Sequence, residues 1–137
     1  MRFVPYQLEH GMYIRQHLAE GIVIPPRHLE ALDGYSAIMD TGEVVACAGL
    51  AQWPDFPHVA TAWAFVNRTI SGAALLAVTR AVQSMLEIRN EQRIEACCRA
   101  DLEKARRWLE ILGFQYEGPA RKYGPDGSDF MRFARVK

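Results

Sequence analysis

The chain has 137 residues, half of them hydrophobic, and its 16 basic residues balance 16 acidic ones, so the formal net charge is zero. A chain of this length is expected to fold as one domain, spanning residues 1–137, with a core of its own. The balanced charge argues against nucleic-acid or membrane-surface binding through bulk charge. We therefore expect no nucleic-acid partner and no membrane partner.

The three cysteines form neither a disulfide framework nor a metal-ligand pattern, because Cys97 and Cys98 are adjacent and Cys47 is far away. We expect them to be small core residues and expect no metal. No amino-terminal segment combines a basic start with a continuous apolar core, and the apolar runs are short of a membrane span. The expected location is the cytoplasm, or the inside of a particle.

The first part of the chain is predicted to hold one strand and two short helices. Arg2 to Leu8 has apolar positions typical of a strand, with Pro5 marking it as an edge or irregular one. A helix is predicted from about Glu9 to Glu20, where Gly21 follows as a stop signal. A second helix is predicted from His28 to Leu32.

A strand meander comes next. Tyr35 to Met39 and Val44 to Ala51 are predicted strands, and the turn Asp40 to Glu43 between them contains the Asp and Gly that a tight reversal requires. The segment Gln52 to His58 holds two prolines and two large aromatics and is predicted to be a loop. It leads into a third strand, Ala60 to Val66, rich in aromatic and β-branched residues.

The run Asn67 to Ala73 connects that third strand to a long helix whose apolar stripe contains Leu75, Val78 and Val82. A strand that passes through a short turn into a helix leaves unpaired backbone N–H groups, with the positive end of the helix dipole behind them. The turn is therefore a candidate anion site. The alternative is that its small residues serve only close packing.

The last part alternates strands and a helix. Arg93 to Cys98 is a predicted strand, and a helix follows that Asp101 caps and Gly113 ends. Gln115 to Tyr123 and Phe130 to Val136 are two more strands around a Gly-Pro-Asp-Gly turn. The order predicts a mixed α/β (α+β) domain with about six to seven strands and about four flanking helices.

This order of elements resembles the GCN5-related N-acetyltransferase (GNAT) superfamily. In that family, a loop of pattern Q/R-x-x-G-x-G/A at the start of the long helix cradles the pyrophosphate of acetyl-CoA. The segment Arg68 to Ala73 matches the first and last positions and has Ser71 in place of the central glycine. The helix that leads into Leu112-Gly113-Phe114 is similar to the family helix beside the pantetheine arm.

The resemblance implies that acetyl-CoA is the co-substrate, without a metal, and that Gly72 lies in its pyrophosphate loop. A side chain at Ser71 would limit how close the pyrophosphate comes. Family members often carry a thiol-protonating tyrosine where this chain has Leu109, and an asparagine where it has Leu102. The residues expected to contact acetyl-CoA are Val66, Arg68, Ser71, Gly72, Ala73 and Arg106.

The resemblance also implies a base that removes a proton from the acceptor amine, although the strand Ala60 to Val66 contains no carboxylate. The candidates are Glu95 on the following strand, His58 in the preceding loop, or a bound water. Strand alternation puts Glu95 on the same face as Cys97. Tyr116 and Tyr123 are the candidates for the acid that reprotonates the thiolate.

Two main functions follow from these expectations. The first is direct acetyl transfer from acetyl-CoA to a small-molecule or protein amine. The second comes from a narrower resemblance of Trp63 to Val66 and Tyr123 to Gly127 to phage-encoded GNAT-like proteins. It implies a catalytically degenerate virion or virion-assembly component, with virion proteins or a second copy as partners. A CoA sensor without turnover is a third function that the fold allows.

Overall fold

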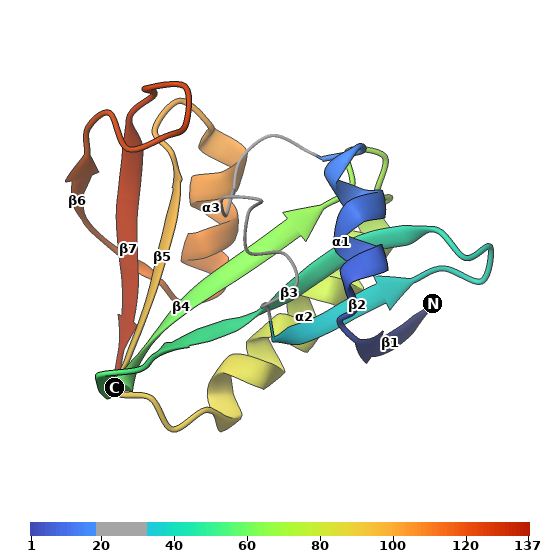
Figure 1. Ribbon diagram of the computed structural model, residues 1–137, viewed down its shortest axis with the longest axis horizontal. Coiled ribbons are helices and arrows are strands. Elements are labelled where there is room, and N and C mark those ends of the chain that lie inside the picture. The colour runs from blue at the N-terminus through green and yellow to red at the C-terminus, as the bar shows by residue number, and fades with distance from the viewer. Residues whose placement is uncertain (19–32) are drawn as a thin grey trace.

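The structure is a computed structural model that describes residues 1–18 and 33–137. These residues form a seven-stranded sheet in the order β1-β2-β3-β4-β5-β7-β6, with helices on both of its faces (Figure 1). In chain order the elements are β1 (Arg2–Pro5), α1 (Leu8–Arg15), β2 (Gly34–Ile38), β3 (Val44–Trp53), β4 (Phe56–Val66), α2 (Gly72–Ile88), β5 (Arg93–Arg99), α3 (Glu103–Ile111), β6 (Gln115–Ala120) and β7 (Phe130–Val136).

The sheet is mixed, as the sequence predicts. Strands β1 to β4 run antiparallel to one another, β5 is parallel to β4, and β7 lies between β5 and β6, antiparallel to both. The second predicted helix, His28 to Leu32, lies outside the described residues. The first predicted helix was expected to reach about Glu20, but α1 ends at Arg15, and the backbone at Leu18 bridges to Asn67 instead. The described residues contain three helices.

The two faces of the sheet have separate cores. Helices α2 and α3 pack on one face, where Leu86 and Leu109 join Ile94 of β5 and Phe133 of β7 in one buried cluster. Helix α1 covers the other face, and its Ile14 packs in a second cluster with aromatic and aliphatic residues of β2 to β4: Ile38, Val44, Cys47, Trp63 and Phe65. Strand alternation separates the two sets.

The prediction that the cysteines are core residues is confirmed for Cys47 and Cys98, which are 1% and 0% exposed. Burial raises the pKa of both thiols to about 11, so they stay neutral at physiological pH. Cys97 is half-buried on the opposite face of β5 from Cys98. All three thiols are free.

The predicted loop Gln52 to His58 is wrong, because β3 continues to Trp53 and β4 begins at Phe56. Cross-strand hydrogen bonds extend the hairpin. The indole N–H of Trp53 donates to Thr61 Oγ1 at 2.9 Å, and the amide of Gln52 donates to the carbonyl of Pro57 at 2.8 Å. These contacts join residues that local sequence patterns do not connect.

Other boundaries also differ from the predictions. The first strand ends at Pro5 rather than Leu8, since Leu8 begins α1. Strand β6 ends at Ala120 rather than Tyr123, because Lys122 takes a left-handed conformation with φ of 55°. Gly113 has φ of 93° after α3, so its predicted role in ending that helix is confirmed.

Asp101 is not the N-cap of α3, as predicted from sequence. Leu102 occupies that position, and the helix begins at Glu103. The Asp101 carboxylate instead accepts hydrogen bonds from Arg99 Nε and Nη2, at 3.2 and 3.0 Å. The guanidinium of Arg99, two residues away, thus competes with the helix N-terminus for this carboxylate. Its hydrogen bonds hold the pKa of Asp101 below the ordinary value.

An ion pair between the half-exposed Arg89 and the buried Glu91 stabilises the connection between α2 and β5. Glu91 is 7% exposed, and its carboxylate accepts hydrogen bonds from Arg89, which hold its pKa below the ordinary value. A carboxyl with a lowered folded-state pKa stabilises the fold above its unfolded pKa of about 4.3, and this stabilisation is lost as pH falls.

We therefore expect Glu91→Gln to lower the urea midpoint at pH 7, and the difference from the natural chain to shrink at pH 3. Urea unfolding at both values measures it. Glu87→Gln, at an exposed position of α2, is the matched control and is expected to change neither midpoint. An equal difference at pH 7 and pH 3 would show that the charge of Glu91 contributes nothing.

Candidate functional site

Strands β4 and β5 diverge. They pair in parallel at only three positions, Val59 with Arg93, Ala60 with Ile94 and Thr61 with Glu95. Beyond Thr61 and Glu95, β4 continues to Val66 and β5 to Arg99 without pairing to each other. Figure 1 shows the two strands moving apart toward their carboxyl ends. Within residues 1–18 and 33–137, the backbone of β4 beyond Thr61 thus has no strand partner on its β5 side.

On the α2 and α3 side, an apolar hollow lies at the point of divergence. Small residues of the two strands, Ala62 and Ala64 of β4 and Ala96 of β5, form its floor. Leu86 of α2 and Leu109 of α3 are among the side chains that close it. Leu109, where the GNAT resemblance leads one to expect a tyrosine, is therefore a core residue here, 2% exposed.

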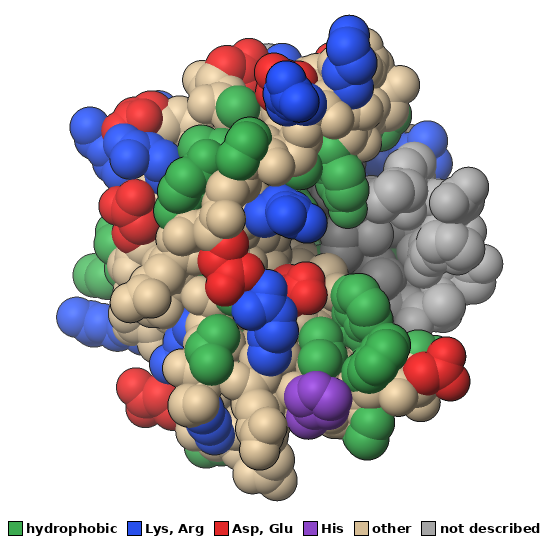
Figure 2. Space-filling view, turned by 90° about the vertical axis from the view of Figure 1, so that its left-hand side faces the viewer, with side chains coloured by type: hydrophobic (Ala, Val, Ile, Leu, Met, Phe, Trp, Pro, Cys, Tyr) green, Lys and Arg blue, Asp and Glu red, His purple; other side chains and the backbone are tan. Residues whose placement is uncertain are grey.

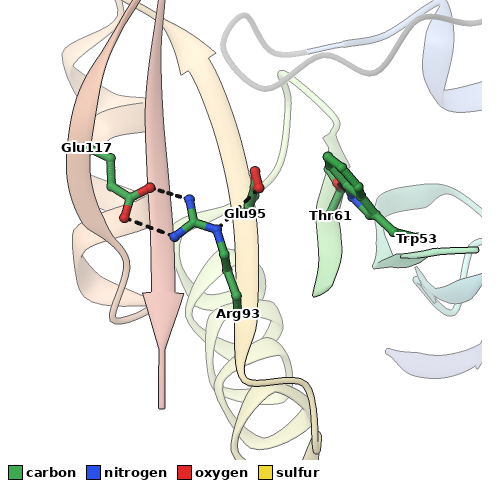
Figure 3. A network of polar contacts seen from close by, with 5 residues as sticks. All are labelled: Trp53, Thr61, Arg93, Glu95 and Glu117. Carbon is green, nitrogen blue, oxygen red and sulfur yellow. Dashed lines mark hydrogen bonds and ion pairs between the residues drawn. The ribbon is translucent and has the colours of Figure 1, made fainter. Parts of the chain in front are cut away.

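On the opposite face, a polar network surrounds the last paired position of β5 (Figure 3). Arg93 donates from Nε to the Glu95 carboxylate at 3.3 Å and from both terminal nitrogens to Glu117, with Nη1 3.1 Å from Oε2. Glu117 is the extra residue of a β-bulge between Tyr116 and Gly118, which turns its side chain toward Arg93.

Arg93 therefore orients Glu95 without saturating it. The two terminal nitrogens of the guanidinium are held by Glu117, and Glu95 receives one long hydrogen bond. Thr61, whose hydroxyl is fixed by Trp53, is the neighbour of Glu95 across the β4–β5 pair (Figure 3). The half-buried carboxylate of Glu95 keeps oxygen lone pairs for a further donor.

A thiol and a phenol lie farther along the same face. Cys97 is two residues beyond Glu95, and the hydroxyl of Tyr123 lies close enough to influence the pKa of its thiol. Burial, helped by the neighbouring Glu95, raises the pKa of Cys97. Burial also raises the pKa of Tyr123, and Cys97 contributes. Both groups therefore hold their protons at neutral pH, and Tyr123 is a potential proton donor.

The turn after β4 is built around the buried side chain of Asn67. Its amide nitrogen donates to the carbonyl of Val44 at 3.2 Å and to Glu43 Oε1 at 3.3 Å. Its oxygen accepts from the backbone N–H and hydroxyl of Thr69, at 3.0 and 2.8 Å. The backbone N–H of Arg68 donates to the carbonyl of His17. These bonds fix the entry into α2.

At the start of α2, Ser71 is the N-cap and its hydroxyl accepts from the backbone N–H of Ala74 at 3.1 Å. Among the described residues, none accepts a hydrogen bond from the amides of Gly72 or Ala73, both of which are exposed. A Cβ placed on Gly72 would meet nothing within 4 Å. The first turn of α2 thus presents free donors at the open end of the β4–β5 divergence.

The structure brings only one of the predicted catalytic side chains to the divergence. Glu95 lies there, but His58 is exposed near the start of β4 and packs against Phe56. Tyr116 packs edge to face on Phe133, a residue of the α3-side cluster. His58 lies where the β3–β4 register is irregular, three residues before Thr61. Alternation directs Tyr116 to the opposite face from Glu95.

The predicted acetyl-CoA contacts lie in two places. Val66 ends β4, and the exposed Arg68, Ser71, Gly72 and Ala73 follow it in the turn. Arg106 lies apart on α3, where Glu103 and Glu110 of the same helix bind its guanidinium.

Sequence reasoning gave no site role to Asn67, Thr61 or Glu117. For Asn67, the available signal was an asparagine directly between the predicted strand and the turn. Glu117 had none, because its contact with Arg93 spans 24 residues and depends on the bulge.

Within residues 1–18 and 33–137, no group of three or more His, Cys, Asp and Glu side chains is arranged to hold a metal ion. No described helix is long and apolar enough to cross a bilayer.

The order of the sheet, the divergence of β4 from β5 and the turn into α2 define the fold of the GNAT N-acetyltransferases, which comparison with solved structures supports. A GCN5-related N-acetyltransferase from Kribbella flavida aligns with a TM-score of 0.70 at 15% identity, covering 99% of this chain and 97% of that one. A ribosomal-protein-S5-alanine acetyltransferase from Vibrio fischeri aligns with a TM-score of 0.69 at 17% identity, covering 98% and 91%.

A spermidine N-acetyltransferase variant from Vibrio cholerae aligns with a TM-score of 0.69 at 12% identity, covering 99% of this chain and 95% of that one. No protein-family model and no curated protein sequence matches the chain. At such identities the likeness establishes the fold.

Proposed function

We propose that this protein is an N-acetyltransferase that moves the acetyl group of acetyl-CoA to an amine. One observation carries the proposal, namely the divergence of β4 from β5. The oriented carboxylate of Glu95 lies where the two strands separate, and the free amides of α2 lie at the far, open end. The structural similarity to N-acetyltransferases supports the same activity.

The donor half of the site fits the chemistry of CoA. In the described part of the chain no strand pairs with β4 beyond Thr61 on the β5 side, so its backbone offers amide and carbonyl groups to the two amides of a pantetheine arm. The exposed amides of Gly72 and Ala73, at the positive end of the α2 dipole, suit a pyrophosphate. Val66, which ends β4, lies between these two regions.

Acetyl-CoA would supply an acetyl thioester, which the amine nitrogen attacks as the carbon–sulfur bond breaks. In this proposal, Glu95 accepts the proton that the amine loses. The proton taken up by the departing thiolate comes from Tyr123, whose raised pKa keeps it protonated beside Cys97. Tyr116 faces away from Glu95, and neither Tyr116 nor His58 has a part in this proposal. Arg106 would first have to leave its two carboxylates to bind phosphate.

The test is a calorimetric titration of acetyl-CoA into the natural chain and into Gly72→Trp. The space beside Gly72 is open, so the variant is expected to fold with unchanged stability while its indole covers the free amides. We expect saturable binding by the natural chain and a loss of at least about tenfold in affinity in the variant.

Ser84→Trp is the matched control, since Ser84 is exposed about three turns farther along α2 and the added indole is the same. Its affinity for acetyl-CoA is expected to equal that of the natural chain. Failure of the natural chain to bind acetyl-CoA at millimolar concentration would contradict the proposal.

The alternative function, a catalytically degenerate phage virion or assembly component, has no supporting observation in the fold or among the comparisons and stays a prediction. The expected cytoplasmic location and the expected association with a second copy also stay predictions. A chain without acetyl-CoA binding, together with stable association in a particle, would favour this alternative.

A further inference from the structure

A polar hollow of about 360 Å³ lies on the face of the sheet where Glu95 projects. Acidic and basic side chains gather side by side in the middle of the molecular surface over this part of the sheet (Figure 2). The described residues of its lining include two arginines and two glutamates, whose formal charges balance: Arg93, Glu95, Glu117 and Arg132. Cys97 and Phe133 are also among its walls.

The two arginines differ in their partners. Arg93 is held by both glutamates of the hollow. Arg132 has no carboxylate within ion-pair distance in the described part of the chain. Its charge contributes to the lowered pKa of Glu117 and partly offsets the raised pKa of Cys97. With respect to the described residues, the guanidinium of Arg132 is therefore free to bind an anion.

The sheet register fixes the separation of Arg132 from Glu95. Glu95 pairs with Ala134 and Cys97 pairs with Arg132, so Glu95 and Arg132 are diagonal neighbours, about 7–8 Å apart between Cα atoms. On its other side Arg132 pairs with Gly118, where a Cβ would meet nothing within 4 Å. Space beside the guanidinium is thus left open.

We propose that the acceptor is a free amino acid, with its amine at Glu95 and its carboxylate on Arg132. The inference rests on the proposed acetyltransferase function and names its substrate class. Arginine binds carboxylates through two parallel hydrogen bonds. The side chains of Glu95 and Arg132 can come close enough for the α-amine and the carboxylate of one amino acid to contact both. A polyamine has no group for Arg132 and is repelled by its charge.

The test measures release of free CoA thiol with a panel of amino acids, the corresponding primary amides, and spermidine as acceptors. Each amide keeps the amine and side chain of its acid and lacks only the negative charge. We expect the natural chain to prefer the acids in kcat/KM. Arg132→Gln is expected to lower kcat/KM for the acids by about 10- to 100-fold and to leave the amides within about twofold.

Two further variants refine the comparison. Arg132→Lys keeps the charge without the bidentate geometry, so it is expected to fall between the natural chain and Arg132→Gln. Arg80→Gln removes an exposed arginine on α2 and is expected to change nothing. Equal use of acids and amides by the natural chain, or equal losses for both in Arg132→Gln, would overturn the inference and leave the acetyltransferase proposal intact.

Calorimetric titration of the acids in the presence of CoA gives a readout independent of turnover. Binding that Arg132→Gln loses supports the inference, and absence of binding to the natural chain overturns it. Acids that bind through Arg132 without being acetylated would instead contradict the proposed function, so the two failures are distinguishable.

Discussion

Glu95→Gln is expected to lower the rate of acetyl transfer by about 10²- to 10⁴-fold, the usual contribution of a general base. Glutamine preserves the shape of the side chain and can still accept the hydrogen bond from Arg93, but it cannot take a proton from the amine. Because the carboxylate lies on the opposite face from the apolar hollow, acetyl-CoA affinity is expected to stay within about twofold.

Steady-state kinetics with saturating acetyl-CoA, together with calorimetry, separates the two quantities. Glu87→Gln, an exposed change on α2, is the matched control and is expected to keep the natural rate. A Glu95→Gln enzyme with more than about a tenth of the natural kcat would assign the proton transfer to another group or to water.

Asn67→Ala is expected to lower the free energy of unfolding by about 2–3 kcal/mol, because it leaves buried polar groups without partners. Asn67 is 0% exposed, and its amide bonds the carbonyl of Val44 and the side chain of Thr69. The same bonds hold the entry into α2, so acetyl-CoA affinity is expected to fall as well.

Urea unfolding measures the stability change, and titration of acetyl-CoA below the transition measures the affinity. Asn90→Ala removes an exposed asparagine from the connection between α2 and β5 and is expected to alter neither quantity. An Asn67→Ala chain with the natural urea midpoint would mean that the turn does not depend on this side chain.

Local patterns predicted much of the fold. The turn at Asp40 to Glu43 and the end of α3 needed a glycine with positive φ, and Gly42 and Gly113 have φ of 90° and 93°. The alternation along β5, with Glu95 opposite Ile94 and Ala96, was also predicted. Such features depend on residues within four positions of one another, so their physical causes are present in the sequence.

The boundaries that failed depend on contacts across the sheet. The β3–β4 hairpin extends through a segment with two prolines because Trp53 bonds Thr61. Asp101 leaves the helix cap because Arg99 binds it. In both places a specific partner overrides the local propensity that the prediction used.

The features of the candidate site likewise divide into those of local origin and those that depend on contacts across the sheet. The sequence by itself determined the strand, the turn with its free amides at Gly72 and Ala73, and the helix that follows, and it gave Glu95 its face on β5. Only the tertiary structure decided that β5 is parallel to β4 and leaves it after Glu95, that a bulge brings Glu117 to Arg93, and that Arg132 lies beside Cys97. These depend on strand order and register, and a slip of one residue would move every side chain of a strand to the other face.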